Sequence, residues 1–513
     1  MKKIKPPFYP IIYIRGFAMT QSAVEETVAT PYMGFNLGST KIRQEWDGEV
    51  KRHIFESPLI RLMKDFGYVD NYSDGLETEG DIPAKSIIIH RYYEQADSDI
   101  GSGDGVPSIE EAAGSLSELI LKTRDQVCGD DSDAKSAFRV YLVAHSMGGL
   151  IARCLLQNDK IGSKEAKSLV DKVFTYGTPH NGIEIRGVNV PRFLGGWDIN
   201  NFNRRRIAEY LQLSGSLGSS NGDTARPWRV PGDESNRVDT LDGKFPESRF
   251  FCHVGTNHDD YNLSRYAVGP MSDGLVLIKN ASIQGAPRTY THHSHSGHYG
   301  LVNSEEGYQN LTRFLFGDVR VTGRMLVRDL PLPPSVRKAH EGGREIRASY
   351  LFECTVMTRG ARFRLSDRRI DNNSAVFRKF DEMFPDNGAS GSKKLRMPVL
   401  FSAFLDRKKI ESGKTLVFTI DLAVKTTDYR ISGNLFTRQR IPEENLFREK
   451  VTLKAVQDKN QWRLRYILTD EQWGENKGRS VTFEGGRFLI PLSSKKGFKS
   501  DLEVTVDLAN TSS

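Results

Sequence analysis

A strand pattern, a tight turn and a helical pattern follow one another between residues 138 and 156, and this succession restricts the possible folds more than any other feature. Residues 138–144 (FRVYLVA) are mostly apolar, as expected for a strand that is covered on both faces. Residues 147–156 space their apolar side chains for the inner side of a helix. Ser146 lies on the turn between them. The segment therefore predicts a parallel sheet covered by helices.

The same alternation of strand and helix patterns extends from Ile11 to Phe316, which is typical of an α/β fold with a doubly wound, mostly parallel sheet. A helix is predicted to begin after Ser108, where Glu111 completes the pattern of a capping box. Another is predicted after Ser304 and closes the domain. The predicted strands are residues 11–14, 86–92, 138–144, 173–176, 249–254, 275–278 and 288–292.

Two long insertions interrupt this alternation, at about residues 18–85 and 182–248. The second is rich in Gly, Asn, Arg and Asp around residues 214–237, a composition typical of irregular chain. Such segments form lids or walls of a substrate site in some enzymes, whereas in others they are surface excursions with no role in substrate choice. The sequence leaves both interpretations open.

The pattern changes after residue 316. An interdomain linker is predicted over residues 321–345, because residues 330–334 (LPLPP) are rich in proline and a charged stretch follows them. It follows an α/β domain predicted at residues 1–320. Residues 346–513 then alternate apolar and polar side chains, with little helical periodicity. We expect them to form a β-rich, sandwich-like domain of antiparallel strands. Its predicted strands are residues 416–424, 451–456, 461–468, 480–483 and 502–508.

The turn at Ser146 has the residues that a strained strand-to-helix elbow needs. Side chains two positions before and after the serine would collide with the neighbouring strand and helix, and Ala144 and Gly148 are small enough to avoid this. The helix behind the serine directs its first N–H groups at the place where negative charge develops during acyl transfer. The pattern thus predicts Ser146 as a nucleophile and the N–H of Met147 as one oxyanion donor.

These residues, with four further segments in the expected order, resemble the lipases and esterases of the α/β-hydrolase superfamily. Residues 13–17 (YIRGF) resemble the oxyanion turn after an early strand, although the superfamily usually has His in place of Arg15. The resemblance implies that the N–H of Phe17 is the second oxyanion donor, while an ordinary strand end with a glycine turn is the alternative. Residues 176–182 (YGTPHNG) resemble the segment that lines the active-site rim in many lipases, and His180 within it is expected to be structural.

The resemblance also implies an acid. Residues 271–276 (MSDGLV) resemble the acid loop of the superfamily, with Asp273 as the carboxylate that holds the base in one tautomer. A plain turn before a strand is the competing interpretation. Asp259 and Asp260 are the alternative acids.

The base is harder to assign, because residues 291–300 (THHSHSGHYG) contain four histidines. His298 precedes the final helix at the spacing typical of the catalytic base in related lipases, and His295 is the second candidate. A metal site built from these histidines is a further alternative, but no matched carboxylates accompany them in the sequence.

The resemblance implies a serine hydrolase that cleaves carboxylic esters, of lipids or other acyl groups, through a Ser-His-Asp triad and an acyl-enzyme intermediate. Lipases, phospholipases and the GPI inositol-deacylase-like branch are the members that the motifs favour. An amidase or thioesterase uses the same triad, and a catalytically silent hydrolase-fold protein that serves as a binding module is the alternative from another class. The mechanism requires no metal and no organic cofactor.

Composition limits the partners and the location. The net charge of +7 is spread over 513 residues, so nucleic-acid binding is not expected, whereas weak peripheral contact with anionic lipid is compatible with it. No apolar stretch approaches the length of a membrane-spanning helix, and the N-terminal residues lack the pattern of an export signal. The four cysteines are widely separated, which favours a reducing compartment. We therefore expect a cytoplasmic protein, and the sequence does not indicate an oligomeric state.

Overall fold

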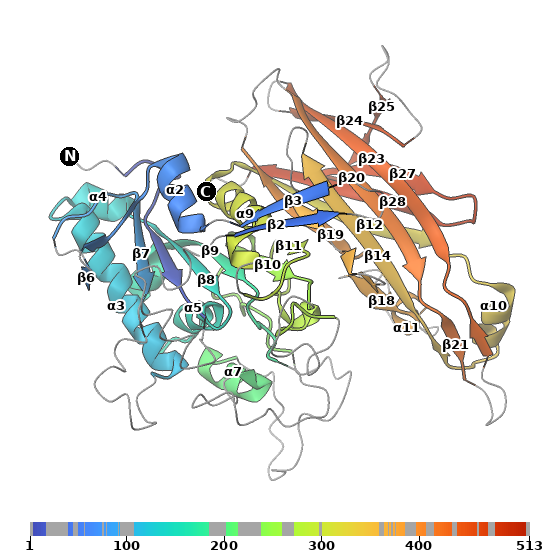
Figure 1. Ribbon diagram of the computed structural model, residues 1–513, viewed down its shortest axis with the longest axis horizontal. Coiled ribbons are helices and arrows are strands. Elements are labelled where there is room, and N and C mark those ends of the chain that lie inside the picture. Colours follow the sequence, from blue (N-terminus) through green and yellow to red (C-terminus); the bar gives the residue numbers. More distant parts are fainter. Residues whose placement is uncertain are drawn as a thin grey trace, which may run out of the picture. The chain divides into compact units, whose positions relative to one another are not determined.

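The computed structural model contains two compact units (Figure 1). One comprises Met1–Arg288 and His293–Leu311, and the other comprises Thr289–His292 and Thr312–Ser513. The residues that the structure describes are 4–16, 39–44, 50–55, 57–73, 76–77, 80–90, 92, 107–183, 202–213, 237–258, 271–296, 300–358, 364–367, 369–370, 373–374, 376–384, 397–406, 415–432, 439–458, 461–469 and 478–508.

A seven-stranded sheet with the order β11-β10-β9-β8-β1-β7-β4 lies at the centre of the α/β part. Strand β1 pairs in parallel with β7 and β8, β8 with β9, β9 with β10, and β4 with β7. The predicted doubly wound, mostly parallel sheet is confirmed. Its strands are β1 (Ile11–Ile14), β4 (Val69–Asp70), β7 (Ser86–His90), β8 (Val140–His145), β9 (Val170–Tyr176), β10 (Phe250–Gly255) and β11 (Arg288–Thr291).

The strand order reverses at β1, and this reversal positions the candidate site. The chain continues from β1 to β7 on one side of it, while β8 pairs on the other side. In such sheets ligands bind outside the carboxyl ends of the strands at the point of reversal. Strand β1 is completely buried, and β8 is buried up to its last residue, which immediately precedes Ser146. The serine is therefore carried by a rigid element.

Helices flank this sheet in sequence and in space (Figure 1). Helix α5 begins directly after the Ser146 turn, packs against α3, and is buried along its whole length. The predicted capping box of α3 is present, because Ser108 and Glu111 each accept a hydrogen bond from the other's backbone N–H. The α-helices of this region are α2 (Pro58–Phe66), α3 (Ile109–Cys128), α4 (Ser132–Ala137), α5 (Gly148–Gln157), α6 (Lys164–Leu169), α7 (Arg204–Leu211) and α9 (Glu305–Phe316).

Both predicted insertions contain regular structure. The described part of the first includes α2, the sheet strand β4 and two strand pairs outside the main sheet. One pair is β2 (Ser39–Gln44) with β3 (Val50–Phe55), and the other is β5 (Tyr72–Ser73) with β6 (Leu76–Glu77). The second includes α7. One predicted strand is wrong: residues 275–278 form bends that lead into a 3₁₀ turn at Ile278–Asn280, because the Asp273 side chain accepts the N–H groups of Leu275 and Val276.

The second unit consists mainly of antiparallel strands, which confirms the predicted β-rich region. One sheet has the order β19-β12-β28-β27-β26, another the order β15-β14-β20-β23-β24-β25, and a third the order β13-β21-β22. The longer strands are β12 (Val319–Asp329), β14 (Ser349–Thr358), β19 (Val399–Leu405), β20 (Thr415–Thr426), β23 (Asn445–Asp458), β24 (Gln461–Ile467), β27 (Arg487–Ser493) and β28 (Lys499–Leu508). The shorter ones in these sheets are β13 (Ile346–Arg347), β15 (Ser366–Asp367), β21 (Tyr429–Ile431), β22 (Gln439–Ile441), β25 (Arg479–Ser480) and β26 (Thr482–Glu484).

The predicted linker at residues 321–345 is wrong. Strand β12 occupies its first part and pairs with both β19 and β28. Buried apolar residues of this strand alternate with the less buried Arg320, Arg324 and Arg328. The prolines that suggested a boundary instead lead into helix α10 (Pro334–Glu341), whose first position accepts proline without loss of a helical hydrogen bond.

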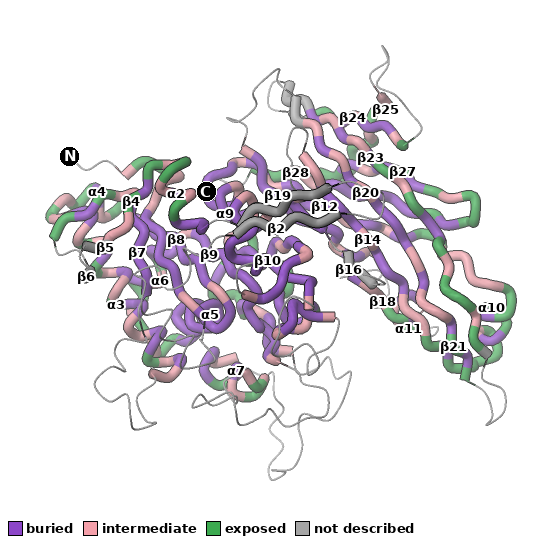
Figure 2. The backbone as a smooth tube through the Cα atoms, viewed as in Figure 1, coloured by how far each residue is buried: buried purple, intermediate pink, exposed green. Residues whose placement is uncertain are grey.

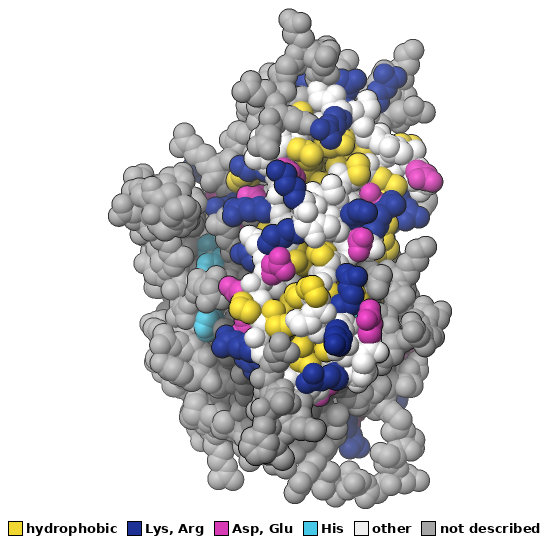
Figure 3. Space-filling view, turned by 90° about the vertical axis from the view of Figure 1, so that its right-hand side faces the viewer, with side chains coloured by type: hydrophobic (Ala, Val, Ile, Leu, Met, Phe, Trp, Pro, Cys, Tyr) yellow, Lys and Arg dark blue, Asp and Glu magenta, His cyan; other side chains and the backbone are white. Residues whose placement is uncertain are grey.

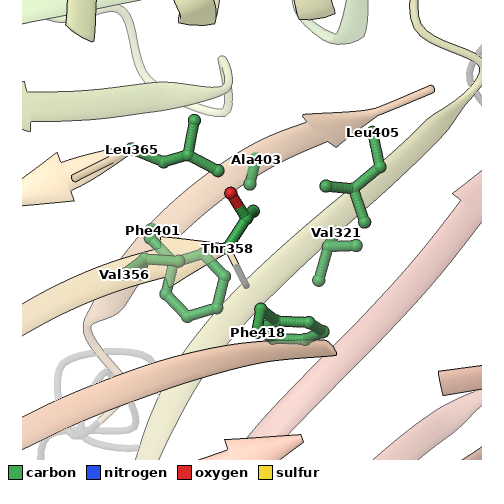
Figure 4. A pocket seen from close by; sticks show the side chains of 8 residues that line it. All are labelled: Val321, Val356, Thr358, Leu365, Phe401, Ala403, Leu405 and Phe418. Atoms are coloured by element: carbon green, nitrogen blue, oxygen red, sulfur yellow. The ribbon is translucent and has the colours of Figure 1, made fainter. Parts of the chain in front are cut away.

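The interior of the second unit lies between its two large sheets, where most strand positions are buried (Figure 2). A small apolar cavity shows how the sheets face each other (Figure 4). Side chains from β12, β19, β14 and β20 meet around it. Its lining residues are Val321, Val356, Thr358, Leu365, Phe401, Ala403, Leu405 and Phe418.

Candidate active site

Ser146 adopts a backbone conformation that is unusual for a residue with a side chain. Its φ is 51°, in the left-handed region, and it stands between the end of β8 and the start of α5. Such a conformation costs roughly 1 kcal/mol or more and persists only where the surroundings enforce it. Its N–H donates to the carbonyl oxygen of Tyr176 at 2.9 Å. The strained turn presents the hydroxyl at the carboxyl edge of the sheet.

Two glycines allow the elbow to pack against the end of β1. A Cβ on Gly148 would overlap the carbonyl oxygen of Ile14, and a Cβ on Gly16 would lie 2.5 Å from the Cβ of Ser146. Gly148 is the small residue that the elbow pattern required. Gly16 brings the turn after β1 beside the serine, but Phe17, the expected second oxyanion donor, lies outside the described residues. Met147 precedes α5, where the first N–H groups have no acceptor within the helix.

His295 joins Ser146 to Asp273. Its Nε2 lies 3.0 Å from Ser146 Oγ, and its Nδ1 lies 2.8 Å from Asp273 Oδ2. The side chains of His295 and Asp273 are only 3% and 1% exposed, so water competes little for these hydrogen bonds. Since a carboxylate only accepts, Nδ1 carries the proton and Nε2 presents its lone pair to the serine hydroxyl.

The Asp273 carboxylate is held by its own loop. The second oxygen of Asp273, Oδ1, accepts the N–H groups of Leu275 at 3.0 Å and Val276 at 2.8 Å. The backbone carbonyl of Asp273 also accepts the N–H of His295 at 2.8 Å. Both carboxylate oxygens therefore have fixed partners, which orients the group toward the imidazole.

The strand-turn-helix segment around Ser146 has a known counterpart. Residues 106–187 match the family of the PGAP1-like alpha/beta domain. This match and the sheet order decide the identity of the fold. The α/β part has the α/β-hydrolase fold. The resemblance to this superfamily that the motifs indicated is thereby confirmed.

One solved structure similar to this chain is the product of the gene lin2722 of Listeria innocua, which has 13% sequence identity and a TM-score of 0.24. The match covers 60% of this chain and 93% of that chain. Another is the protein named the putative cell surface hydrolase of Lactobacillus plantarum WCFS1, with 13% identity, coverage of 66% and 98%, and a TM-score of 0.27. No curated protein matches the chain in sequence.

Two further glycines of the hydrolase domain make room for the Asp–His pair. Gly177, with φ of 54°, follows β9, and a Cβ there would lie 3.0 Å from Asp273 Oδ2 and 3.1 Å from His295 Nδ1. A Cβ on Gly255 would lie 2.8 Å from the Cβ of Asp273. Sequence reasoning missed this role. The available signal was a glycine directly after each of the predicted strands 173–176 and 249–254, namely Gly177 and Gly255.

His145 contacts the backbone of His295. Its Nε2 donates to the backbone carbonyl of His295 at 3.0 Å, and the two rings lie 5.0 Å apart. Burial, together with the proximity of His295, lowers the pKa of His145 to about 3. The His145 ring is therefore neutral at physiological pH and acts as a fixed donor.

A buried arginine ties the surroundings of the site together. Arg153, on α5, is fully buried and donates to the carbonyl oxygens of His180, Val238 and Thr240 at 2.7–2.8 Å. Burial lowers its pKa to about 10, so the guanidinium keeps its charge at neutral pH. The chain just before the second insertion and the last part of that insertion are thus both anchored to α5.

The remaining candidates divide into two groups. His180 is buried, lies 3.1 Å from Thr175 Oγ1, and does not contact the triad residues in the described structure, while His293 pairs with Glu306 at 2.9 Å. His298, Asp259 and Asp260 lie outside the described residues. Within the described part of the chain, no three His, Cys, Asp or Glu side chains are grouped to hold a metal.

Proposed function

We propose that this protein is a serine hydrolase that cleaves carboxylic esters with Ser146 as nucleophile, His295 as base and Asp273 as acid. The observation that carries the proposal is the unbroken path of hydrogen bonds from Asp273 through His295 to Ser146, at 2.8 and 3.0 Å, on a strained elbow. Nucleophile, base and orienting acid in this order are what acyl transfer requires.

In the proposed mechanism, Ser146 Oγ attacks the acyl carbonyl while His295 Nε2 takes its proton. Asp273 stabilises the imidazolium, and the N–H groups of Met147 and Phe17 hold the oxyanion. The tetrahedral intermediate collapses when His295 returns the proton to the leaving alcohol. Water activated by the same imidazole then releases the acid and restores the serine.

His295 takes the place of His298 as the proposed base. The spacing before the final helix favoured His298, but the described geometry puts His295 within hydrogen-bond distance of both partners. The mechanism needs one imidazole, and the Asp273 carboxylate that would orient it is hydrogen-bonded to His295.

The proposed substrates are lipid or other acyl esters. This class rests on the match to the PGAP1-like alpha/beta domain and on the lipase-like segment around Gly177. A cytoplasmic location remains part of the proposal. It is supported by the four cysteines, which are buried free thiols, as expected in a reducing compartment. No helix of the described residues is long and apolar enough to cross a membrane.

Hydrolysis of p-nitrophenyl esters of graded chain length, with phospholipids as a second series, tests the proposal. Ser146→Ala should lower kcat/KM by about 10⁴-fold or more, whereas Ser168→Ala on exposed α6 should leave it unchanged. His295→Ala should approach the loss of Ser146→Ala, and His298→Ala should retain most activity. Equal activity of Ser146→Ala and the parent protein on every ester would refute the enzyme and leave a binding module.

A further inference from the structure

Three arginines stand side by side across the smallest sheet of the second unit. Strands β13 (Ile346–Arg347), β21 (Tyr429–Ile431) and β22 (Gln439–Ile441) pair so that Arg347 is opposite Arg430, and Arg430 is opposite Arg440. Neighbouring strands lie about 4.8 Å apart, so the three side chains leave one face of the sheet in a single line. We refer to Arg347, Arg430 and Arg440 as the arginine row.

The arginine row faces solvent because the opposite face of the sheet is packed. Ile346, Tyr429 and Ile431 are buried, and the Tyr429 ring lies 6.4 Å from that of Phe380 on helix α11 (Phe380–Met383). The flanking arginines keep 77% and 72% of their side chains exposed. Lys and Arg also dominate the charged side chains on the face that Figure 3 shows.

The charges in the row are only partly compensated. Arg347 pairs with Glu345 at 2.7 Å, and Arg440 donates to Asp428 at 2.6 Å. Arg430, between them, has no ion pair among the described residues. Like charges placed directly opposite each other destabilise a sheet, so this arrangement opposes the fold rather than supports it.

A fourth guanidinium adds to the positive charge. Arg344 donates to the carbonyl oxygen of Ser432, at the end of β21, at 2.6 and 2.9 Å. Four guanidinium groups therefore lie at this edge of the unit. The acidic residues beside them are Glu345, Asp428 and Glu443, whose N–H donates to Asp428 Oδ1 at 3.1 Å. Planar guanidinium forks bind the oxygens of phosphate groups in a bidentate way, more specifically than ammonium groups do.

We propose that the arginine row docks the protein on the phosphate groups of an anionic phospholipid surface. The choice of a lipid rather than a soluble phosphate rests on the proposed lipid-ester activity. The outward positions of these short strands carry arginines without an aromatic side chain, which suits lipid phosphates better than stacked nucleic-acid bases. Anionic leaflets attract basic side chains close to the surface, and salt screens that attraction.

Co-sedimentation with vesicles tests the proposal, with Ser146→Ala in every protein to prevent hydrolysis. The full chain should bind vesicles of phosphatidylcholine with phosphatidylserine and bind pure phosphatidylcholine vesicles weakly. The triple variant Arg347→Gln, Arg430→Gln, Arg440→Gln should bind the anionic vesicles about tenfold to hundredfold more weakly. Arg430→Gln alone should give part of this loss.

A charge-matched control separates the row from general basicity. Arg448→Gln, Lys450→Gln and Arg463→Gln remove three exposed cations from β23 and β24 and should have a much smaller effect. Equal losses in the two triple variants would overturn the proposal. So would tighter binding of inorganic phosphate or of a DNA duplex than of the anionic vesicles.

Two further measurements, the melting temperature and the hydrolysis of soluble esters, separate a loss of docking from a loss of folding or of activity. The melting temperature of the arginine-row variant should stay close to that of the parent protein, because relief of like-charge repulsion offsets the loss of two exposed ion pairs. With Ser146 restored, this variant should hydrolyse soluble p-nitrophenyl esters at the parent rate. Loss of vesicle binding with soluble activity intact supports docking by the row, whereas absence of esterase activity in the parent refutes only the proposed function.

Discussion

Replacing Gly177 by Ala tests whether the Asp–His pair depends on close packing against the turn after β9. The φ of 54° at this position disfavours any residue with a Cβ, at a cost of about 1–2 kcal/mol in the free energy of unfolding. The added Cβ would also lie 3.0 Å from Asp273 Oδ2 and 3.1 Å from His295 Nδ1. These two atoms share the hydrogen bond of 2.8 Å, so the pair must shift by a few tenths of an ångström.

That shift should lower kcat more than it raises KM. Gly177 faces the Nδ1 side of the His295 ring, and the movement is passed on to Nε2, which must stay aligned with Ser146 Oγ. Because a misplacement of about 1 Å can cost about 100-fold in rate, we expect kcat to fall by about 10-fold to 100-fold. KM should change little, because in the proposed mechanism the ester reacts on the Nε2 side of the ring.

The assay combines steady-state ester hydrolysis with urea unfolding of the same preparations. Gly67→Ala is the matched control, because Gly67 has φ of 68° and an added Cβ would meet no atom within 4 Å. Both variants should lose similar stability, and only Gly177→Ala should lose kcat. If kcat is unchanged in both, close packing does not hold the Asp–His pair.

Four further predictions concern the same domain. Asp273→Asn should lower kcat by about 10⁴-fold with little change in KM, measured by ester hydrolysis, because the imidazole loses its fixed tautomer. His145→Leu should lower kcat about tenfold by removing the donor to the His295 carbonyl, and His145→Gln should restore most of it. Arg153→Met should lower the free energy of unfolding in urea by about 3–5 kcal/mol, because buried carbonyl oxygens lose their donor. Burial holds the pKa values of His145 and His253 at about 3, while the unfolded chain protonates both near pH 6.5. Their contribution to stability should therefore be constant above about pH 6.5 and fall by up to about 1.4 kcal/mol per pH unit for each between about pH 6.5 and 3, which urea titrations from pH 7 to 4 would detect.

Local patterns were enough to predict most of the hydrolase sheet. Strands β1, β7, β8, β9, β10 and β11 overlap predicted segments, because strands covered on both faces are nearly continuous apolar runs. The capping box of α3 is likewise a local hydrogen-bond pattern that the sequence displays directly. Residues 275–278 look like another strand, but their N–H groups are taken by a side chain rather than by a neighbouring strand.

The linker prediction failed because it relied on composition. Charged residues and prolines are common in linkers, yet in β12 the arginines occupy every fourth position of an alternating strand. The partners of β12, strands β19 and β28, lie far along the chain. Pairing over such distances cannot be inferred from the neighbourhood of one segment.

The candidate site could be predicted in part. The strand-turn-helix pattern predicted Ser146 and the acid loop predicted Asp273, and both side chains lie within hydrogen-bond distance of His295. The choice between His295 and His298 needed the path of the loop, in which Ser294 pairs with Gly300 and the N–H of Leu301 donates to the carbonyl of Ser294 at 2.9 Å. These contacts place Leu301 beside Ser294, so spacing along the sequence from the final helix does not tell which histidine faces the serine.

Labelling with a fluorophosphonate probe, read out by peptide mass spectrometry, tests the central proposal most directly. The probe forms a stable adduct only with a serine that a neighbouring base activates. We predict a single adduct on Ser146, formed at the same site in His298→Ala, and greatly slowed in His295→Ala. Correctly folded protein that carries no adduct on Ser146, or that reacts equally fast without His295, would contradict the proposed mechanism.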